Sequence, residues 1–246
     1  MVLNYTLSLL FAPLLAAIVL TIVWILRGRD RYPGLVTSFT LGMFSYSIVL
    51  LFQFIAMKLG LDNLVNLRRI IFYSFVVMGL GSEIGKLLIL RYYSFTRPSY
   101  NGPLDSIVYS IMISMGFAFM GNLQYFTFPL YPGPEVDFLY AYTVIPGNLF
   151  FAVIMGFFVG MGKSRENKFV DSMTGLLGAA FFHALFDFCF ITRDYRLLHF
   201  LTIRALDKVI MLNYKANENN NEYKRKNNNK LKKTVQYPRQ TYKQKL

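Results

Sequence analysis

Long apolar runs follow one another along the chain, and each is long enough to cross a lipid bilayer as a helix. A crossing helix needs about 20 predominantly apolar residues. Six windows meet this requirement: 5–26, 35–59, 70–90, 104–128, 138–161 and 173–191. Turn-forming segments separate several of them, such as RPSYNGP after the third and YPGPEVD after the fourth. The pattern predicts an all-α, polytopic bundle of about six transmembrane helices over residues 1–192.

A seventh stretch, 197–212, is apolar at helical spacing but carries Arg204, Asp207 and Lys208. A charge at the bilayer centre costs about 3 kcal/mol, so we interpret residues 193–213 as an amphipathic interfacial helix. The remaining residues, 214–246, are rich in Asn and Lys and have no apolar periodicity. This composition predicts a basic, disordered tail that binds anionic lipid headgroups.

The composition excludes a soluble domain, because 54% of the residues are hydrophobic and the mean hydropathy is +0.39. The net charge of +13 is concentrated near the C-terminus, where residues 215–246 hold ten Lys or Arg and two Glu. It therefore indicates no nucleic-acid partner. A single cysteine, Cys189, excludes an internal disulfide framework. No basic residue precedes the first apolar run, which favours a retained first helix over a cleaved signal peptide.

The basic residues give conflicting signals about membrane orientation. Lys and Arg residues are enriched in cytoplasmic loops, and they follow the first, third and fifth predicted helices, whereas the fourth-to-fifth loop has none. These loops favour a cytoplasmic position for the odd-numbered connections and an outside N-terminus. Six helices would then place the strongly basic tail outside as well, against the same rule. Either one segment is miscounted or re-entrant, or the tail does lie across the membrane.

Four of the six predicted helices carry polar side chains away from their ends. These are Glu83 and Lys86 in the third helix, Asn122 and Gln124 in the fourth, Asn148 in the fifth, and His183 and Asp187 in the sixth. Each pair can be explained as contacts between helices, worth about 0.6 kcal/mol each, or as a functional site. Together they predict one polar cavity shared by the helices.

Two pairs of glycines, Gly81 with Gly85 and Gly156 with Gly160, stand four residues apart in predicted helices. Small residues at this spacing let transmembrane helices approach closely. We interpret both pairs as packing positions.

The order of four sequence blocks resembles the PrsW family of intramembrane proteases, which are relatives of the CaaX-prenyl endopeptidases. The blocks are SEIGK, PLDSIVYSIMISMGFAFMGNLQYF, PGNLFFAVIMGFFVG and FFHALFDF, within residues 81–188. The resemblance implies a bacterial cytoplasmic-membrane protein whose site activates a water for attack on a peptide bond, with or without a metal. It also implies catalytic positions at Glu83, Asn122 and His183, with Lys86 and Asp187 in support.

The chain departs from the family pattern at three positions. Ser82 stands where the first of two adjacent glutamates is expected, Gly121 replaces the acid of a Glu-Asn pair, and Asn148 replaces a histidine after Pro-Gly. None of these residues can act as a base near neutral pH without help. The substitutions predict weakened or lost proteolysis in a scaffold that keeps its cavity for transmembrane segments.

Three hypotheses about function follow. The first is a degenerate relative that binds single-pass or other membrane proteins. The second is a working endopeptidase that uses Glu83 and His183, for which zinc would be the candidate cofactor. The third is a small transporter that uses the buried charges as an ion path, although the chain lacks the paired halves expected of internal repeats. The sequence predicts no certain cofactor and no metal ligands.

Overall fold

The computed structural model describes residues 2–28, 33–97, 100, 102–127, 134–165 and 167–236. Every regular element in these ranges is helical. In chain order they are α1 Val2–Arg27, α2 Leu35–Lys58, α3 Leu67–Phe72, η2 Tyr73–Leu80, α4 Gly81–Ile89, η3 Leu90–Ser94, α5 Pro103–Thr127, α6 Pro134–Ser164, α7 Lys168–Thr192 and α8 Tyr195–Gln236. Six spans of the described chain are long and apolar enough to cross a membrane, which confirms the predicted polytopic bundle.

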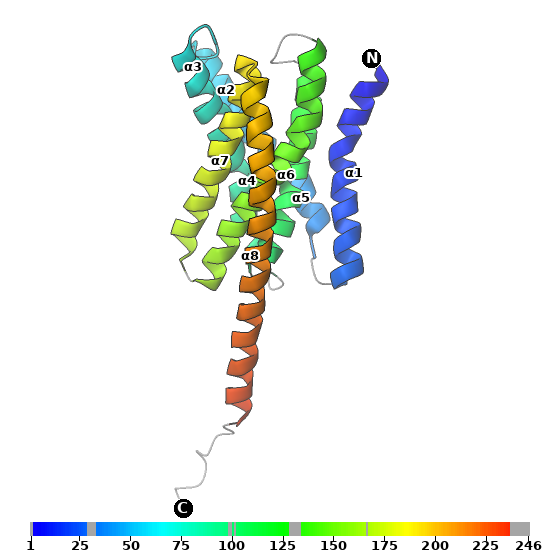
Figure 1. Ribbon diagram of the computed structural model, residues 1–246, viewed down its shortest axis with the longest axis vertical. Helices are drawn as coiled ribbons and strands as arrows, with labels where there is room; N and C mark the ends of the chain where they lie inside the picture. The colour runs from blue at the N-terminus through cyan, green and yellow to red at the C-terminus, as the bar shows by residue number, and fades with distance from the viewer. Residues whose placement is uncertain are drawn as a thin grey trace, which may run out of the picture.

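Helix α5 packs against α1, α2 and α6, and α6 packs in turn against α7 (Figure 1). Both glycine pairs lie at such contacts. A Cβ added at Gly156 would stand 2.7 Å from the Cα of Ile107 in α5, and one at Gly85 would stand 2.6 Å from the carbonyl oxygen of Ser45 in α2. Both glycines therefore permit a helix approach that a larger residue would prevent, as predicted.

The third predicted span is not a uniform α-helix. It begins as α3, continues as the π-helical segment η2, returns to α-helix in α4 and ends in the π-helical η3. A π-helical turn inserts extra backbone and rotates the side chains that follow it, and such turns are frequent at functional sites. The two π-helical segments flank the turn of α4 that carries Glu83 and Lys86, which nothing in the apolar pattern indicated.

The C-terminal region differs from its prediction, because α8 is one helix from Tyr195 to Gln236 and shows no boundary at residue 213. The sequence between 195 and 236 contains no Pro or Gly, so no residue in it breaks a helix. Leu212, Ala216 and Asn220 are buried at four-residue spacing and extend the packed face of α8 into the predicted tail. Residues 237–246 of that tail lie outside the described residues.

Helix α8 runs beside α6 and α7 along the height of the bundle and projects beyond the end where α1 and α6 end and α7 begins (Figure 1). At that end Asn220 lies against Gly102, which precedes α5. The packed part from Leu198 to Asn220 would measure about 33 Å along a helix axis, close to the roughly 30 Å thickness of a bilayer core. This course offers an explanation of the conflict over orientation, because it brings the C-terminal part of α8 to the end of the bundle that carries Lys163 and Lys168.

We therefore expect the two termini to lie on opposite sides of the membrane. Protease added outside spheroplasts should remove a tag at residue 1 and leave a tag after residue 246 intact until the membrane is permeabilised, because the positive-inside rule places the basic end in the cytoplasm. The matched control is the same pair of tags on a chain that ends at residue 194, in which both termini should be accessible from outside. External cleavage of both tags in the full chain would contradict this course of α8.

Candidate active site

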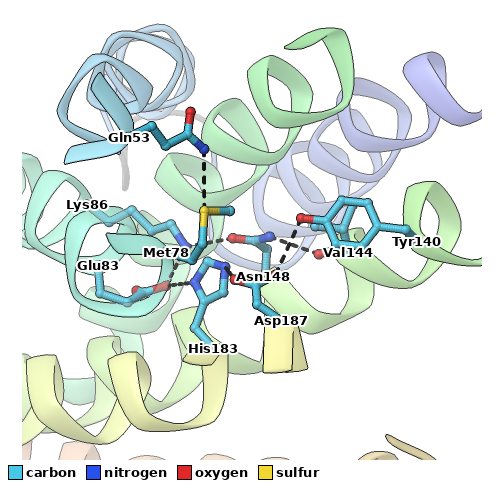
Figure 2. Close-up of polar contacts among 9 residues, drawn as sticks. All are labelled: Gln53, Met78, Glu83, Lys86, Tyr140, Val144, Asn148, His183 and Asp187. Atoms are coloured by element: carbon cyan, nitrogen blue, oxygen red, sulfur yellow. Dashed lines mark hydrogen bonds and ion pairs between the residues drawn. The ribbon is translucent and has the colours of Figure 1, made fainter. Parts of the chain in front are cut away.

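Polar side chains from α4 and α6 meet in the interior of the bundle (Figure 2). The ammonium nitrogen Nζ of Lys86 donates to Oε1 of Glu83 at 2.6 Å and to Oδ1 of Asn148 at 2.6 Å. The relative exposures of Glu83, Lys86 and Asn148 are 0%, 1% and 0%. The ammonium is thus bound by a carboxylate from its own helix and an amide from a neighbouring helix, with no exposure to the surroundings.

The sixth span, α7, joins the same group through His183. Its Nδ1 lies 2.7 Å from Oε1 of Glu83, although the two residues are 100 positions apart in the sequence. An ionised carboxylate can only accept, so Nδ1 carries the proton when Glu83 is charged. The carboxylate of the third span and the imidazole of the sixth therefore share one hydrogen bond, and the predicted juxtaposition of these two spans is present.

Asp187 extends the group one turn further along α7. Its Oδ2 lies 3.5 Å from Nε2 of His183, and the hydroxyl of Tyr140 donates to its Oδ1 at 3.5 Å. Both distances are long for strong hydrogen bonds, so these contacts orient the groups more than they bind them. The connected set consists of Asn148, Lys86, Glu83, His183, Asp187 and Tyr140, which we call the polar cluster.

The local sequence of α6 explains how Asn148 reaches the polar cluster. Pro146 lies inside α6 and cannot donate a backbone hydrogen bond. Two residues later, the amide nitrogen of Asn148 donates to the carbonyl oxygen of Val144 at 2.9 Å. This bond to its own helix fixes the side chain so that its carbonyl oxygen faces Lys86.

Two phenylalanine rings form the walls of the polar cluster. The ring of Phe151 stacks on His183 with centroids 4.6 Å apart and an interplanar angle of 17°. Lys86 Nζ lies 4.3 Å from the centroid of Phe117, which supplies a cation–π contact in addition to the carboxylate. These rings exclude water and hold the ammonium and the imidazole in fixed orientations.

The remaining predicted site residues lie nearby but outside the hydrogen-bonded set. Asn122 donates from its amide nitrogen to the carbonyl oxygen of Ala141 at 3.2 Å and so joins α5 to α6. Ser82 is buried in α4 and has no hydrogen bond to the polar cluster among the described residues. A Cβ at Gly121 would stand 3.3 Å from the ring of Tyr46.

Sequence reasoning missed two features of this interior. Tyr140 is one of 17 tyrosines, and its immediate neighbours in the sequence, Leu139 and Ala141, are apolar. Gln124, expected in the shared cavity, instead accepts from the hydroxyl of Tyr46 and donates to Gln53 at 3.1 Å, and Gln53 donates to the sulfur of Met78 at 3.3 Å. The polar side chains of α5 and α2 thus form a second, separate group.

Two carboxylate oxygens of the polar cluster, Oε2 of Glu83 and Oδ2 of Asp187, have no hydrogen-bond partner in the described part of the chain. Oε2 of Glu83 is buried and unpaired there, whereas Oε1 accepts from both Lys86 and His183. Buried carboxylate oxygens are usually paired. These two oxygens are therefore the acceptors that could bind a water or a substrate hydrogen, and Oδ2 of Asp187 lies 3.5 Å from Nε2 of His183.

An apolar cavity of about 190 Å³ lies between α6, α7 and α8. The rings of Phe151 and Phe186 line it, and Phe151 is the ring that stacks on His183. One aromatic side chain therefore separates the cavity from the polar cluster. On the other side, Leu198 and Val209 of α8 close the cavity.

Residues 31–211 match the family described as PrsW family intramembrane metalloprotease. The chain belongs to the PrsW family. It is 32% identical over 121 residues to Protease PrsW of Clostridioides difficile (strain 630), an alignment that covers 47% of the chain and 50% of that protein. It is 29% identical over 99 residues to Protease PrsW of Geobacillus kaustophilus (strain HTA426), which covers 39% and 43%.

The aligned region thus spans about half the length of these curated PrsW relatives. No solved structure matches the chain. Family membership and the six apolar helices identify an integral membrane protein of the bacterial cell membrane. The family match over residues 31–211 confirms the resemblance from which the site residues were carried over, while the role of each residue stays a prediction.

The donors of the polar cluster do not fit the metal that the family description implies. Among the described residues, no three His, Cys, Asp or Glu side chains converge on one point. The ammonium of Lys86 lies between Glu83 and Asn148, at hydrogen-bond distance from both, so a cation already occupies the position where these two oxygens could share a metal ion. The cluster holds one imidazole, and its Nδ1 is bonded to Glu83.

Proposed function

We propose that this PrsW-family protein binds transmembrane segments of other membrane proteins and that its proteolytic activity is weakened or lost. The observation that carries the proposal is the position of Lys86, whose ammonium bridges Glu83 and Asn148 in a fully buried group. This arrangement gives the buried ammonium two oxygen acceptors from two helices and so stabilises the bundle. It occupies Oε1 of Glu83 and leaves only Oε2 of Glu83 and Oδ2 of Asp187 as carboxylate oxygens of the polar cluster without a donor among the described residues.

The three substituted positions support weakened proteolysis. Ser82, Gly121 and Asn148 supply no carboxylate or imidazole where the family pattern has one, and Asn148 uses its amide to bind Lys86 and its own helix. Loss of a general base commonly lowers a rate by about 100-fold to 10 000-fold. Three such losses relative to the family pattern favour binding over turnover.

The apolar cavity supports recognition of a transmembrane segment. Its lining comes from α6, α7 and α8 and is apolar apart from Thr143 and Thr202, which suits an apolar side chain presented within the membrane. Phe151 separates it from His183. A bound segment would therefore lie within one ring of the polar cluster.

A second candidate function is intramembrane proteolysis with Glu83 as base and His183 as its partner. Two observations favour it: the unpaired Oε2 of Glu83 and the hydrogen bond between Glu83 and His183. In this hypothesis Lys86 and Asp187 hold the two groups in place, and an amide such as that of Asn122 would have to stabilise the oxyanion.

Restoring the missing groups distinguishes the two functions. The experiment incubates four proteins in liposomes with a panel of labelled single-pass proteins, with and without Zn²⁺. The four are the parent, the His183→Ala variant, a Ser82→Glu/Asn148→His variant, and the last variant with Gly121→Glu added. Because a Cβ at position 121 meets the ring of Tyr46 at 3.3 Å, Gly121→Glu is paired with Tyr46→Ala. We expect the parent to cleave at no more than about 1% of the rate of the restored variants.

Cleavage by the parent that His183→Ala abolishes would favour the second candidate and overturn the first. Binding is tested with a photoreactive residue in place of Val209, which lines the cavity, and in place of Ile25, which is 76% exposed on α1. Crosslinks to a single-pass segment from position 209 but not from position 25 support recognition at the cavity. Equal crosslinking from both positions contradicts it.

A further inference from the structure

Three cationic side chains from three helical segments meet on one aromatic ring at the end of the bundle. Arg91 of η3 lies 4.3 Å from the centroid of Phe95, Lys163 of α6 lies 5.0 Å from it and Lys168 of α7 lies 5.9 Å from it. Lys163 also lies 5.6 Å from the centroid of Tyr100. Phe95 and Tyr100 pack together with their centroids 5.1 Å apart, so they form a shared aromatic surface beneath the cations.

None of these three residues is ion-paired with a carboxylate in the described part of the chain, although the buried Asp105 acts on Tyr100 together with Arg91. No described carboxylate lies within ion-pair distance of Arg91, Lys163 or Lys168. The Nη1 of Arg91 is buried without a hydrogen-bond partner there, and Nζ of Lys163 donates to the backbone carbonyl of Phe95 at 3.3 Å. The cation–π contacts are worth about 0.5–1 kcal/mol each at exposed sites and leave the mutual repulsion of three like charges in place.

Tyr100 does not supply the missing negative charge. Its side chain is fully buried, and this burial raises the pKa of the phenol above its ordinary value. The phenol therefore stays protonated and neutral at physiological pH. The three cations are therefore available to an external anion, since none of them is ion-paired within the described residues.

The position of the cations indicates where that anion comes from. Lys163 ends one apolar span, Lys168 begins the next and Arg91 lies in the last turn of a third. All three therefore lie at the level of the membrane surface, where phosphate headgroups are found. Arg and Lys are the usual phosphate ligands in proteins.

We infer that Arg91, Lys163 and Lys168 form a binding site for a phosphate group at the membrane surface, over the rings of Phe95 and Tyr100. This site is distinct from the polar cluster and from the basic region of α8. It requires three particular side chains, whereas the positive-inside effect depends on the number of basic residues in a connection. A charge-matched variant separates the two explanations.

The test compares the parent with Lys163→Gln/Lys168→Gln and with Arg165→Gln/Lys215→Gln. Arg165 and Lys215 are exposed and have no cation–π contact with Phe95 or Tyr100 among the described residues, so the control removes the same charge from elsewhere at the basic end. Each protein is purified in neutral detergent and titrated with phosphatidylglycerol, phosphatidylcholine or inorganic phosphate. Native mass spectrometry counts bound molecules, and thermal unfolding reports stabilisation.

We expect the parent and the control to retain one phosphatidylglycerol that the Lys163→Gln/Lys168→Gln variant binds on the order of tenfold more weakly, given about 1 kcal/mol per surface Lys or Arg. Binding of phosphatidylglycerol without inorganic phosphate identifies a lipid headgroup as the source, and binding of both identifies any phosphate. Equal binding by all three proteins overturns the site, as does no binding by the parent. The tags at the two termini check that each variant keeps the parent orientation.

Discussion

Glu83→Gln is expected to lower the free energy of unfolding by about 3–5 kcal/mol, because it leaves a buried ammonium without its counter-charge. Nζ of Lys86 is 2.6 Å from Oε1 of Glu83, and both side chains are at most 2% exposed. Asn148 and the ring of Phe117 would still contact the ammonium, but neither carries a negative charge. Unfolding by sodium dodecyl sulfate in mixed micelles measures the change.

A second substitution shows whether the loss comes from the uncompensated charge. Adding Lys86→Met to Glu83→Gln removes both charges with little change in volume, so we expect it to recover at least half of the lost stability, since buried ion pairs can often be replaced by apolar groups at small cost. The stability that is not recovered reflects Oδ1 of Asn148, which loses the hydrogen bond from Lys86 when that residue becomes Met. The control is Glu218→Gln, the same chemical change at an exposed position of α8, expected to alter stability by less than about 0.5 kcal/mol. If Glu83→Gln behaves like this control, the ion pair is not buried as described.

The spans could be predicted from the sequence because the bilayer imposes one strong requirement, an apolar helix of sufficient length. Helix α8 could not be placed in this way. Its first half contains Arg204, Asp207 and Lys208, and these charges lower its hydropathy. Hydropathy alone does not show that such a helix can bury one face against the other helices of a membrane bundle. Leu198 and Ala216 are buried by that contact, and only tertiary structure reveals it.

The candidate site was predictable in part. The spacing of Glu83 with Lys86, and of His183 with Asp187, places each pair on one helix face. Their meeting across 100 residues was expected because four spans carry polar side chains that need a common interior, but periodicity along one helix does not specify which of these side chains pair, and Gln124 lies in a separate group. The role of Asn148 as an acceptor for Lys86 could not be anticipated either, since it depends on how Lys86 and Asn148 face each other across the interface between α4 and α6.

Gly160→Ala should destabilise the bundle by about 3 kcal/mol, at the upper end of overpacking costs, while Gly147→Ala in the same helix should change stability by less than about 1 kcal/mol. A Cβ at position 160 would lie 2.4 Å from the Cα of Pro103, a backbone atom that cannot move without displacing α5 from α6. A Cβ at position 147 would meet nothing closer than the ring of Phe186 at 3.4 Å, an ordinary contact. Because the chemical change is the same, the difference between the two variants in unfolding by sodium dodecyl sulfate reports the steric term alone. Equal stability of Gly160→Ala and Gly147→Ala would show that α5 and α6 are not in backbone contact at Gly160. The position of α6, which carries Asn148, would then need revision.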